Sequence, residues 1–194
     1  MNITLVTGPA RSGKSEWAES LAEKVAIQDN QQLIYVATAQ RNLDDAEWQA
    51  RIDKHVQRRS PSWQCVEVPI NLTEAIAQYD SSYCLLVDSL GTWLTNLIEL
   101  TEKEWQMSQS ELIAALKQTP ATVVLVAEET GWGVVPAYKM GRTFRDRLGA
   151  LSRHIGELAT TVYLVTSGYA IDLTLLGQPI GDRSVNRPTD KIAP

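Results

Sequence analysis

The chain is poor in cysteine and has no long apolar run. Only Cys65 and Cys84 occur in 194 residues, and their separation fits no metal-ligand spacing. We therefore expect two reduced thiols in a cytoplasmic protein, without a disulfide framework. No apolar stretch approaches the roughly 20 residues of a membrane-spanning helix. The opening segment "NITLVTG" reads as a strand and has no signal-peptide pattern.

Positive charge is also scarce. There are 18 Lys and Arg against 23 Asp and Glu, a net charge of −5, and the isoelectric point is about 5.1. This balance argues against nucleic acid as a partner bound through overall charge. Any polyanionic ligand must therefore meet local cations. With 44% hydrophobic residues, the chain is long enough for one domain with a full core, residues 1–194.

Short β-branched runs alternate with helical stretches, which predicts an α/β fold with a mostly parallel, doubly wound sheet. Runs such as "LIYVAT", "YCLLVD" and "TVVLVA" are apolar throughout, as strands buried on both faces are. The predicted strands are Ile3–Thr7, Leu33–Thr38, Tyr83–Asp88, Thr122–Ala127 and Val162–Ser167. The predicted helices are Lys14–Ala26, Asp44–Arg59, Gly91–Leu100, Ser108–Lys117 and Thr143–Leu158. The tail, residues 170–194, is rich in Gly, Pro, Asp and Asn, and we expect it to be loosely ordered or used at a subunit contact.

Residues 8–15 read "GPARSGKS", which matches the phosphate-binding loop (P-loop) pattern G-x-x-x-x-G-K-[ST] between a strand and a helix. Backbone N–H groups and the positive end of the helix would surround a nucleotide triphosphate. Lys14 would reach the β- and γ-phosphates, and Ser15 would bind Mg²⁺. The predicted nucleotide-binding residues of this loop are Gly8, Pro9, Ala10, Arg11, Ser12, Gly13, Lys14 and Ser15.

Acidic residues end two of the buried strands. Asp88 closes "YCLLVD", the place where P-loop proteins hold magnesium, although it could instead cap the next helix. Glu128 and Glu129 follow "TVVLVA". They could contact magnesium, a ribose or a substrate hydroxyl, or be solvated.

The run "RIDKHVQRR", residues 51–59, is basic in an acidic chain. As a helix it would place Arg51, Lys54, His55, Arg58 and Arg59 on one face. Neighbouring cations favour a neutral imidazole at His55, which can act as a nucleophile, while the cations bind phosphate oxygens. The alternative is a solvated face with an incidental histidine. His154 lies in an amphipathic stretch and is given no role.

These segments together resemble a known family. "TGPARSGKS", "YVATAQ", "ARIDKHVQRR", "LLVDSLGTWLTNL" and "GWGVVP…GRTFRDRLG" have the order and spacing of adenosylcobinamide kinase/adenosylcobinamide-phosphate guanylyltransferase. The resemblance runs from residue 4 to about residue 168. It implies a RecA-like P-loop NTPase fold and a homotrimer. It also implies Mg²⁺ as cofactor, ATP and GTP as nucleotide substrates and a corrinoid, adenosylcobinamide and its phosphate, as the other substrate.

The resemblance implies two reactions: phosphorylation of the aminopropanol hydroxyl of the corrinoid, and transfer of GMP to that phosphate through a guanylyl-histidine. The pattern R-I-x-x-H assigns the nucleophile to His55, in agreement with the charge argument; Lys14 and Asp88 carry over as P-loop residues. Three segments depart from the family pattern. Glu128-Glu129-Thr130-Gly131 replaces Asn-Glu-Val-Gly, Ser89-Leu90-Gly91 replaces Cys-Leu-Thr, and Ser152-Arg153 replaces Asn-Gln.

Two other functions fit parts of the sequence. A simple P-loop small-molecule kinase would need no covalent intermediate, and its basic helix would only clamp phosphates. A GTP-binding regulatory module would use the loop as a switch, but the short loops give little sign of long switch segments.

Overall fold

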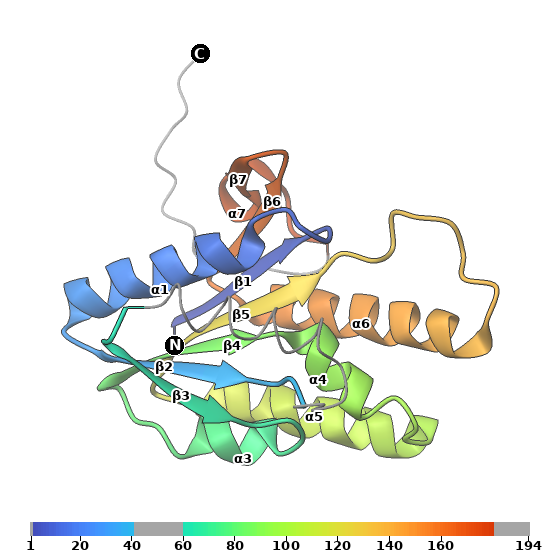
Figure 1. Cartoon of the computed structure of the whole chain (residues 1–194), viewed down its shortest axis with the longest axis horizontal. Helices are drawn as coiled ribbons and strands as arrows, with labels where there is room; N and C mark the ends of the chain where they lie inside the picture. Colours follow the sequence, from blue (N-terminus) through green and yellow to red (C-terminus); the bar gives the residue numbers. More distant parts are fainter. Residues whose placement is uncertain (1, 41–59, 181–194) are drawn as a thin grey trace.

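The computed structural model describes residues 2–40 and 60–180, in which seven strands form one sheet in the order β3-β2-β4-β5-β1-β6-β7 (Figure 1). Neighbouring strands run parallel except β6 and β7, which are antiparallel. The strands are β1 (Asn2–Gly8), β2 (Gln32–Ala37), β3 (Trp63–Glu67), β4 (Tyr83–Asp88), β5 (Thr122–Glu128), β6 (Thr161–Thr166) and β7 (Tyr169–Asp172). The predicted α/β, mostly parallel sheet is therefore confirmed.

Helices cover both faces of the sheet. Ala18 and Ala22 of the first helix pack with Cys84 and Leu86 on one face, whereas the other helices from residue 72 to residue 158 cover the opposite face (Figure 1). The helices are α1 (Lys14–Asp29), α3 (Leu72–Ala77), α4 (Leu90–Asn96), α5 (Glu102–Gln118), α6 (Lys139–Leu158) and α7 (Leu173–Leu176). This layering is the doubly wound arrangement that the sequence predicted, and it agrees with the RecA-like fold implied by the resemblance.

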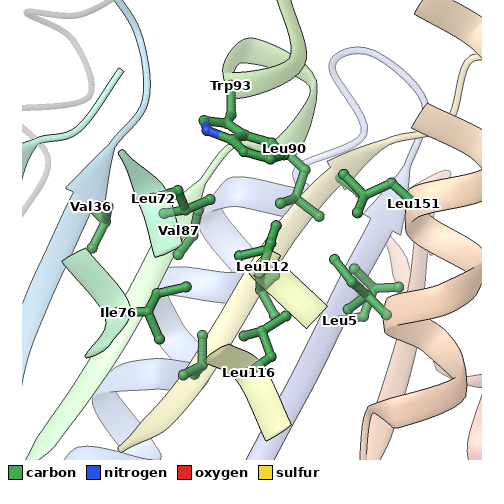
Figure 2. Packing of buried hydrophobic residues seen from close by; sticks show 14 of the residues in the cluster. Leu5, Val36, Leu72, Ile76, Val87, Leu90, Trp93, Leu112, Leu116 and Leu151 are labelled. Atoms are coloured by element: carbon green, nitrogen blue, oxygen red, sulfur yellow. The ribbon is translucent and has the colours of Figure 1, made fainter. Parts of the chain in front are cut away.

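The larger core cluster lies between the sheet and the helices α3 to α6. Figure 2 shows side chains from β1, β2 and β4 meeting side chains from all four helices. Trp93 is 2% exposed, and its indole N–H donates to the Ile70 carbonyl over 2.8 Å. Burial of such large side chains contributes about 1.5–3 kcal/mol each. This packing fixes the strand ends at which the P-loop and Asp88 lie.

All five predicted strands are present, with ends shifted by one residue or less. The match reflects complete burial: the four central positions of β2 and of β4 and the first six of β5 are buried. Strand β3 was not predicted, because its five residues lie at the sheet edge, are half-buried or exposed and lack a continuous apolar run. Helix α3 was also not predicted; it has only six residues.

Several helix ends differ from the predicted ones. Helix α5 begins at Glu102 rather than Ser108, because Thr101 and Glu104 form a reciprocal capping box that stabilises an extra turn and a half. Helix α6 begins at Lys139 rather than Thr143. Helix α4 ends at Asn96 rather than Leu100. The predicted helix Asp44–Arg59 lies outside the described residues.

The expectation of a loosely ordered tail is wrong for its first part. The chain turns back at Ser167 and Gly168, both with positive φ, and β7 then pairs with β6. The Asp172 carboxylate accepts hydrogen bonds from Thr174 N–H and Leu175 N–H and so caps α7. Residues 181–194 lie outside the described residues. Within the described ranges, no helix is long and apolar enough to cross a membrane.

Candidate nucleotide-binding site

The P-loop follows β1 and leads directly into α1. Its backbone takes left-handed conformations at Arg11 (φ 60°) and Gly13 (φ 88°), and Ser12 N–H donates to the Pro9 carbonyl over 3.3 Å. Gly13 is the N-cap of α1 and has no side chain to bond the first N–H groups. These donors are therefore available to an anion, as the P-loop interpretation requires.

Two features of the loop fit a phosphate ligand. A Cβ on Gly8 would lie 2.2 Å from the Val165 carbonyl oxygen, so the loop can leave the sheet here only with glycine. The Ser12 hydroxyl is buried without a hydrogen-bond partner among the described residues, which is costly unless a ligand supplies one. Lys14 is 9% exposed, and its ammonium donates to the Pro9 carbonyl over 3.4 Å.

Ser15 lies on the side of α1 that faces the sheet. It is three residues before Ala18 and seven before Ala22, both of which are buried against β4, and this spacing marks one helix face. On β4, Asp88 follows Cys84 and Leu86 at intervals of two, so it points to the same face of the sheet as they do. Ser15 and Asp88 are thus both directed into the space between α1 and the carboxyl end of β4.

Asp88 is held by Tyr35 of β2, whose hydroxyl donates to Oδ2 over 2.8 Å. The suggestion that Asp88 caps the following helix is wrong. Ser89 is the N-cap of α4, and its hydroxyl accepts from Thr92 N–H. The β4–α4 turn is fixed further by Thr38, which donates its hydroxyl proton to the Ser89 carbonyl and accepts from Ser89 N–H.

Glu128 ends β5, directly opposite Gly8 in the sheet register. Its Oε1 accepts from the Ser89 hydroxyl and its Oε2 accepts from Gly91 N–H over 3.0 Å. Burial raises the pKa of Glu128, an effect opposed by the Ser89 hydrogen bond and the Lys14 charge and reinforced by Asp88. The interpretation of Glu128 as a solvated residue is therefore wrong. It lies within electrostatic reach of both Lys14 and Asp88.

Glu129 occupies a different position from Glu128. Its N–H donates to the Gly8 carbonyl over 2.8 Å, which joins the start of the next loop to the P-loop. Its carboxylate accepts a hydrogen bond from Gly131 N–H over 3.2 Å. The Glu129 side chain therefore stabilises its own loop. The two neighbouring glutamates thus have separate roles.

Not all predicted site residues can be placed. The basic residues Arg51, Lys54, His55, Arg58 and Arg59 lie outside the described residues. The sequence interpretation also missed Tyr35, Thr38 and Ser89. Thr38 and Ser89 directly follow the carboxyl ends of β2 and β4, a position where ligands bind in parallel sheets, and that position was the signal available for them. Tyr35 lies inside β2 and carries no such signal.

The residues present suit a nucleotide with magnesium. Mg²⁺ is usually bound by one or two protein oxygens together with phosphate oxygens and water. Ser15 and Asp88 could supply the protein oxygens, Lys14 would neutralise phosphate charge, and the ion would draw charge from the reacting phosphate. No cluster of three or more His, Cys, Asp or Glu side chains suited to a metal occurs in residues 2–40 and 60–180.

Known structures and curated sequences resemble the chain to different degrees. A KaiC-like protein of Pyrococcus horikoshii shares 16% identity, with a TM-score of 0.46, over 84% of this chain and 70% of its own. The flagellar accessory protein FlaH of Methanocaldococcus jannaschii shares 13% identity, with a TM-score of 0.49, over 91% of this chain and 81% of its own.

Curated sequence relatives share a much higher sequence identity with the chain. The bifunctional adenosylcobalamin biosynthesis protein CobU of Escherichia coli is 39% identical over 88% of this chain and 99% of its own length. The corresponding protein CobP of Pseudomonas aeruginosa is 35% identical over 91% and 98%. The family model of cobinamide kinase/cobinamide phosphate guanyltransferase matches residues 4–173, the range in which the P-loop, Asp88 and Glu128 lie. The chain therefore belongs to the cobinamide kinase/cobinamide phosphate guanyltransferase family.

Proposed function

We propose that this chain is a bifunctional transferase that phosphorylates adenosylcobinamide and then transfers GMP from GTP to the new phosphate. The observation that carries this proposal is the family match across residues 4–173, on a fold whose P-loop, Asp88 and Glu128 lie at one edge of the sheet. Both reactions would occur in the single domain that we propose for residues 1–194.

In the kinase reaction, the P-loop would hold the triphosphate with Lys14 on its β- and γ-phosphates and with Mg²⁺ bound to Ser15 and Asp88. The substrate hydroxyl oxygen would attack the γ-phosphorus. The new O–P bond forms as ADP or GDP leaves, and the hydroxyl proton passes to solvent. Lys14 is buried and already turned into the loop, so it needs little reordering to stabilise the developing charge.

The loop between β5 and α6 is a suitable contact for the corrin ring. It starts at Glu129, beside the P-loop, and it exposes apolar side chains: Trp132 is 64% exposed, Val134 95% and Tyr138 82%. Arg142 holds the loop's end by donating to the carbonyls of residues 136 and 137. A large, mainly apolar macrocycle could cover this surface while its aminopropanol arm reaches the γ-phosphate.

This contact predicts a selective loss of substrate affinity. Trp132→Ser should raise the KM for adenosylcobinamide several-fold, because aromatic stacking on a flat ligand is lost. The KM for ATP should stay within about twofold. Ile27→Ser provides a matched control, since Ile27 is 82% exposed on the last turns of α1. An unchanged corrinoid KM in Trp132→Ser would remove this loop from the proposal.

In the guanylyl transfer, His55 would be the nucleophile, and the cationic side chains Arg51, Lys54, Arg58 and Arg59 would bind the phosphates of GTP. A histidine nitrogen attacks the α-phosphorus, a P–N bond forms and diphosphate leaves. The phosphate of adenosylcobinamide phosphate then attacks the same phosphorus, the P–N bond breaks and adenosylcobinamide-GDP is released. The support is the R-I-x-x-H pattern and the clustered charge of residues 51–59.

The covalent intermediate gives the decisive experiment. GTP labelled at the α-phosphate should label the wild-type protein through a bond that survives base and is lost in acid. His55→Ala should take no label, whereas His154→Ala, which changes the chain's other histidine on the exposed side of α6, should label normally. A wild-type protein that binds GTP but never takes label would favour the simple kinase.

The kinase activity needs its own test. Lys14→Ala should abolish phosphate transfer to adenosylcobinamide, whereas Lys24→Ala, an exposed lysine ten residues along the same helix, should leave it intact. His55→Ala should keep kinase activity and lose guanylyl transfer. We further propose a cytoplasmic homotrimer; light scattering after size-exclusion chromatography tests the assembly, and a mass close to the 21.5 kDa of one chain would contradict it.

A further inference from the structure

Tyr35 is a buried polar residue with a direct contact to the nucleotide site. It lies in the middle of β2 and is 4% exposed. Its hydroxyl donates to Asp88 Oδ2 over 2.8 Å. In the parallel register Tyr35 is paired with Leu86, and Asp88 is paired with Ala37. The Tyr35 ring therefore reaches two residues along the sheet, toward the carboxyl edge, to meet the carboxylate.

Aromatic packing holds the Tyr35 ring in place. Trp63 of β3 lies edge-on to it, with ring centroids 6.1 Å apart and an interplanar angle of 81°. The Trp63 indole N–H donates to Glu23 Oε1 of α1 over 2.9 Å. A ring confined between strands and helix in this way has little freedom to move its hydroxyl. The donor to Asp88 is thus preorganised by three elements of the fold, β2, β3 and α1.

The hydrogen bond to Oδ2 fixes the orientation of the Asp88 carboxylate and therefore the direction in which Oδ1 points. Within the described residues, the hydrogen bond from Tyr35 engages Oδ2 of Asp88, and no such bond to Oδ1 is present. Without the tyrosine donor, the carboxylate could rotate and exchange its two oxygens. Partners that orient metal-binding residues typically change metal affinity by about 10- to 100-fold when they are removed.

We propose that Tyr35 is a positioning residue for Asp88, holding Oδ2 so that Oδ1 is presented to the magnesium ion of the nucleotide or to a water bound to that ion. The inference rests on the magnesium role of Asp88 in the proposed function. In this proposal Tyr35 acts through Asp88 and not by its own contact to the nucleotide or the metal. Its effect should therefore appear in metal affinity and not in nucleotide binding without metal.

The test compares metal binding in Tyr35→Phe, Asp88→Asn and wild type. Phenylalanine keeps the ring and its packing on Trp63 and removes the hydroxyl. Mn²⁺ replaces Mg²⁺ as a probe, and its binding is followed by the electron paramagnetic resonance signal of the free ion, with a non-hydrolysable GTP analogue at saturation. A fluorescent nucleotide measures binding in EDTA.

We expect the dissociation constant for Mn²⁺ to rise about tenfold in Tyr35→Phe, in the range found for such partners, and nucleotide affinity in EDTA to stay within twofold. Tyr163→Phe is the matched control. Tyr163 also packs edge-on against a tryptophan, Trp17, with centroids 5.7 Å apart, but its hydroxyl does not bond Asp88. Its variant should bind Mn²⁺ as wild type does.

Three results would overturn the proposal. If Asp88→Asn weakens Mn²⁺ binding and Tyr35→Phe does not, Asp88 holds the metal without help from Tyr35. If neither variant weakens it, the magnesium role of Asp88 fails as well, and the two failures are thereby distinguished. If Tyr35→Phe weakens nucleotide binding in EDTA equally, its effect is a general distortion of the site.

A second substitution guards against a packing defect in Tyr35→Phe. 4-Fluorophenylalanine at position 35 fills nearly the same volume as tyrosine but cannot donate a hydrogen bond. It should weaken Mn²⁺ binding as phenylalanine does. Wild-type Mn²⁺ affinity with 4-fluorophenylalanine would show that volume and not the hydroxyl matters, which would also overturn the proposal.

Discussion

Gly91→Ala offers a quantitative test of the contact between α4 and β5. A Cβ on Gly91 would lie 2.0 Å from Oε2 of Glu128 and 2.8 Å from its Cδ, and the third nearest atom, Oε1 of the same residue, is 3.5 Å away. The Glu128 carboxylate would have to move, and it would lose its bonds to Gly91 N–H and the Ser89 hydroxyl. Hydrogen bonds to charged groups contribute about 1.5–3 kcal/mol each. We therefore expect Gly91→Ala to destabilise the protein by about 3–6 kcal/mol if both bonds break, and by about 1.5–3 kcal/mol if the carboxylate keeps one of them.

The same substitution should be harmless once Glu128 is absent. In a Glu128→Ala background the three nearest obstacles are removed, and replacing glycine by alanine inside a helix is favourable by about 0.5–1 kcal/mol. The coupling energy between positions 91 and 128 should therefore be about 2–4 kcal/mol if one bond breaks in Gly91→Ala, and larger if both break, at or above the upper end for contacting residues.

The assay is urea unfolding of wild type, both single variants and the double variant, followed by circular dichroism. Only shifts in midpoint at a constant slope should be interpreted as stability changes. Gly149→Ala is the control in each background, because a Cβ at Gly149 meets no atom within 4 Å. An equal cost of Gly91→Ala in both backgrounds, within about 0.5 kcal/mol, would refute the contact.

Three further predictions concern single positions. Gly149→Ala alone should stabilise the protein by about 0.5–1 kcal/mol in urea unfolding, since the residue is exposed within α6; destabilisation would contradict the open space there. Gly8→Ala should cost about 1–3 kcal/mol through overpacking against the Val165 carbonyl and should prevent nucleotide binding, measured by fluorescence titration. At pH 8, a thiol reagent should modify exposed Cys65 quickly and Cys84 only after unfolding, because burial, with a smaller contribution from the Asp29 charge, raises the pKa of Cys84 to about 12. The unfolded thiol ionises first, so stability should fall as pH rises from about 9 toward 12, less steeply in Cys84→Ala.

The strands of the sheet could be predicted from the sequence because a strand buried on both faces appears there as a continuous run of apolar residues. Strands such as β4 and β5 are apolar at nearly every position, and the P-loop pattern places β1 and α1 beside each other. Strand β3 carries no such signal, because its side chains at the sheet edge are partly solvated. Its existence depends on pairing with β2, and a single sequence does not reveal which strands pair.

The sequence predicted the motif residues of the candidate site. It did not predict the residues that hold them in place through hydrogen bonds. Lys14, Ser15 and Asp88 stand at fixed places in a local pattern. Tyr35 lies 53 positions before Asp88, and in the sequence it reads as one more strand residue of "LIYVAT". Its relation to Asp88 follows from the β2–β4 register, which is information about pairing in space. The same is true of Ser89 and Glu128, which lie 39 positions apart.

The residues at positions 89, 91 and 128, where the resemblance implies departures from the family pattern, form one physical unit. Glu128 places a carboxylate whose Oε2 lies 2.0 Å from where any Cβ at position 91 would be, so a residue with a side chain at position 91 could not coexist with it in this geometry. Glycine at 91 makes room and offers its N–H, and the Ser89 hydroxyl supplies a strong donor to Oε1. A side chain at position 91 would collide with the Glu128 carboxylate, and without the Ser89 hydroxyl the buried Oε1 would keep an unused lone pair. Taken together, these contacts keep the β4–α4 turn, and with it Asp88, anchored to β5. The three residues thus fix the sheet edge at which the proposed nucleotide chemistry would occur.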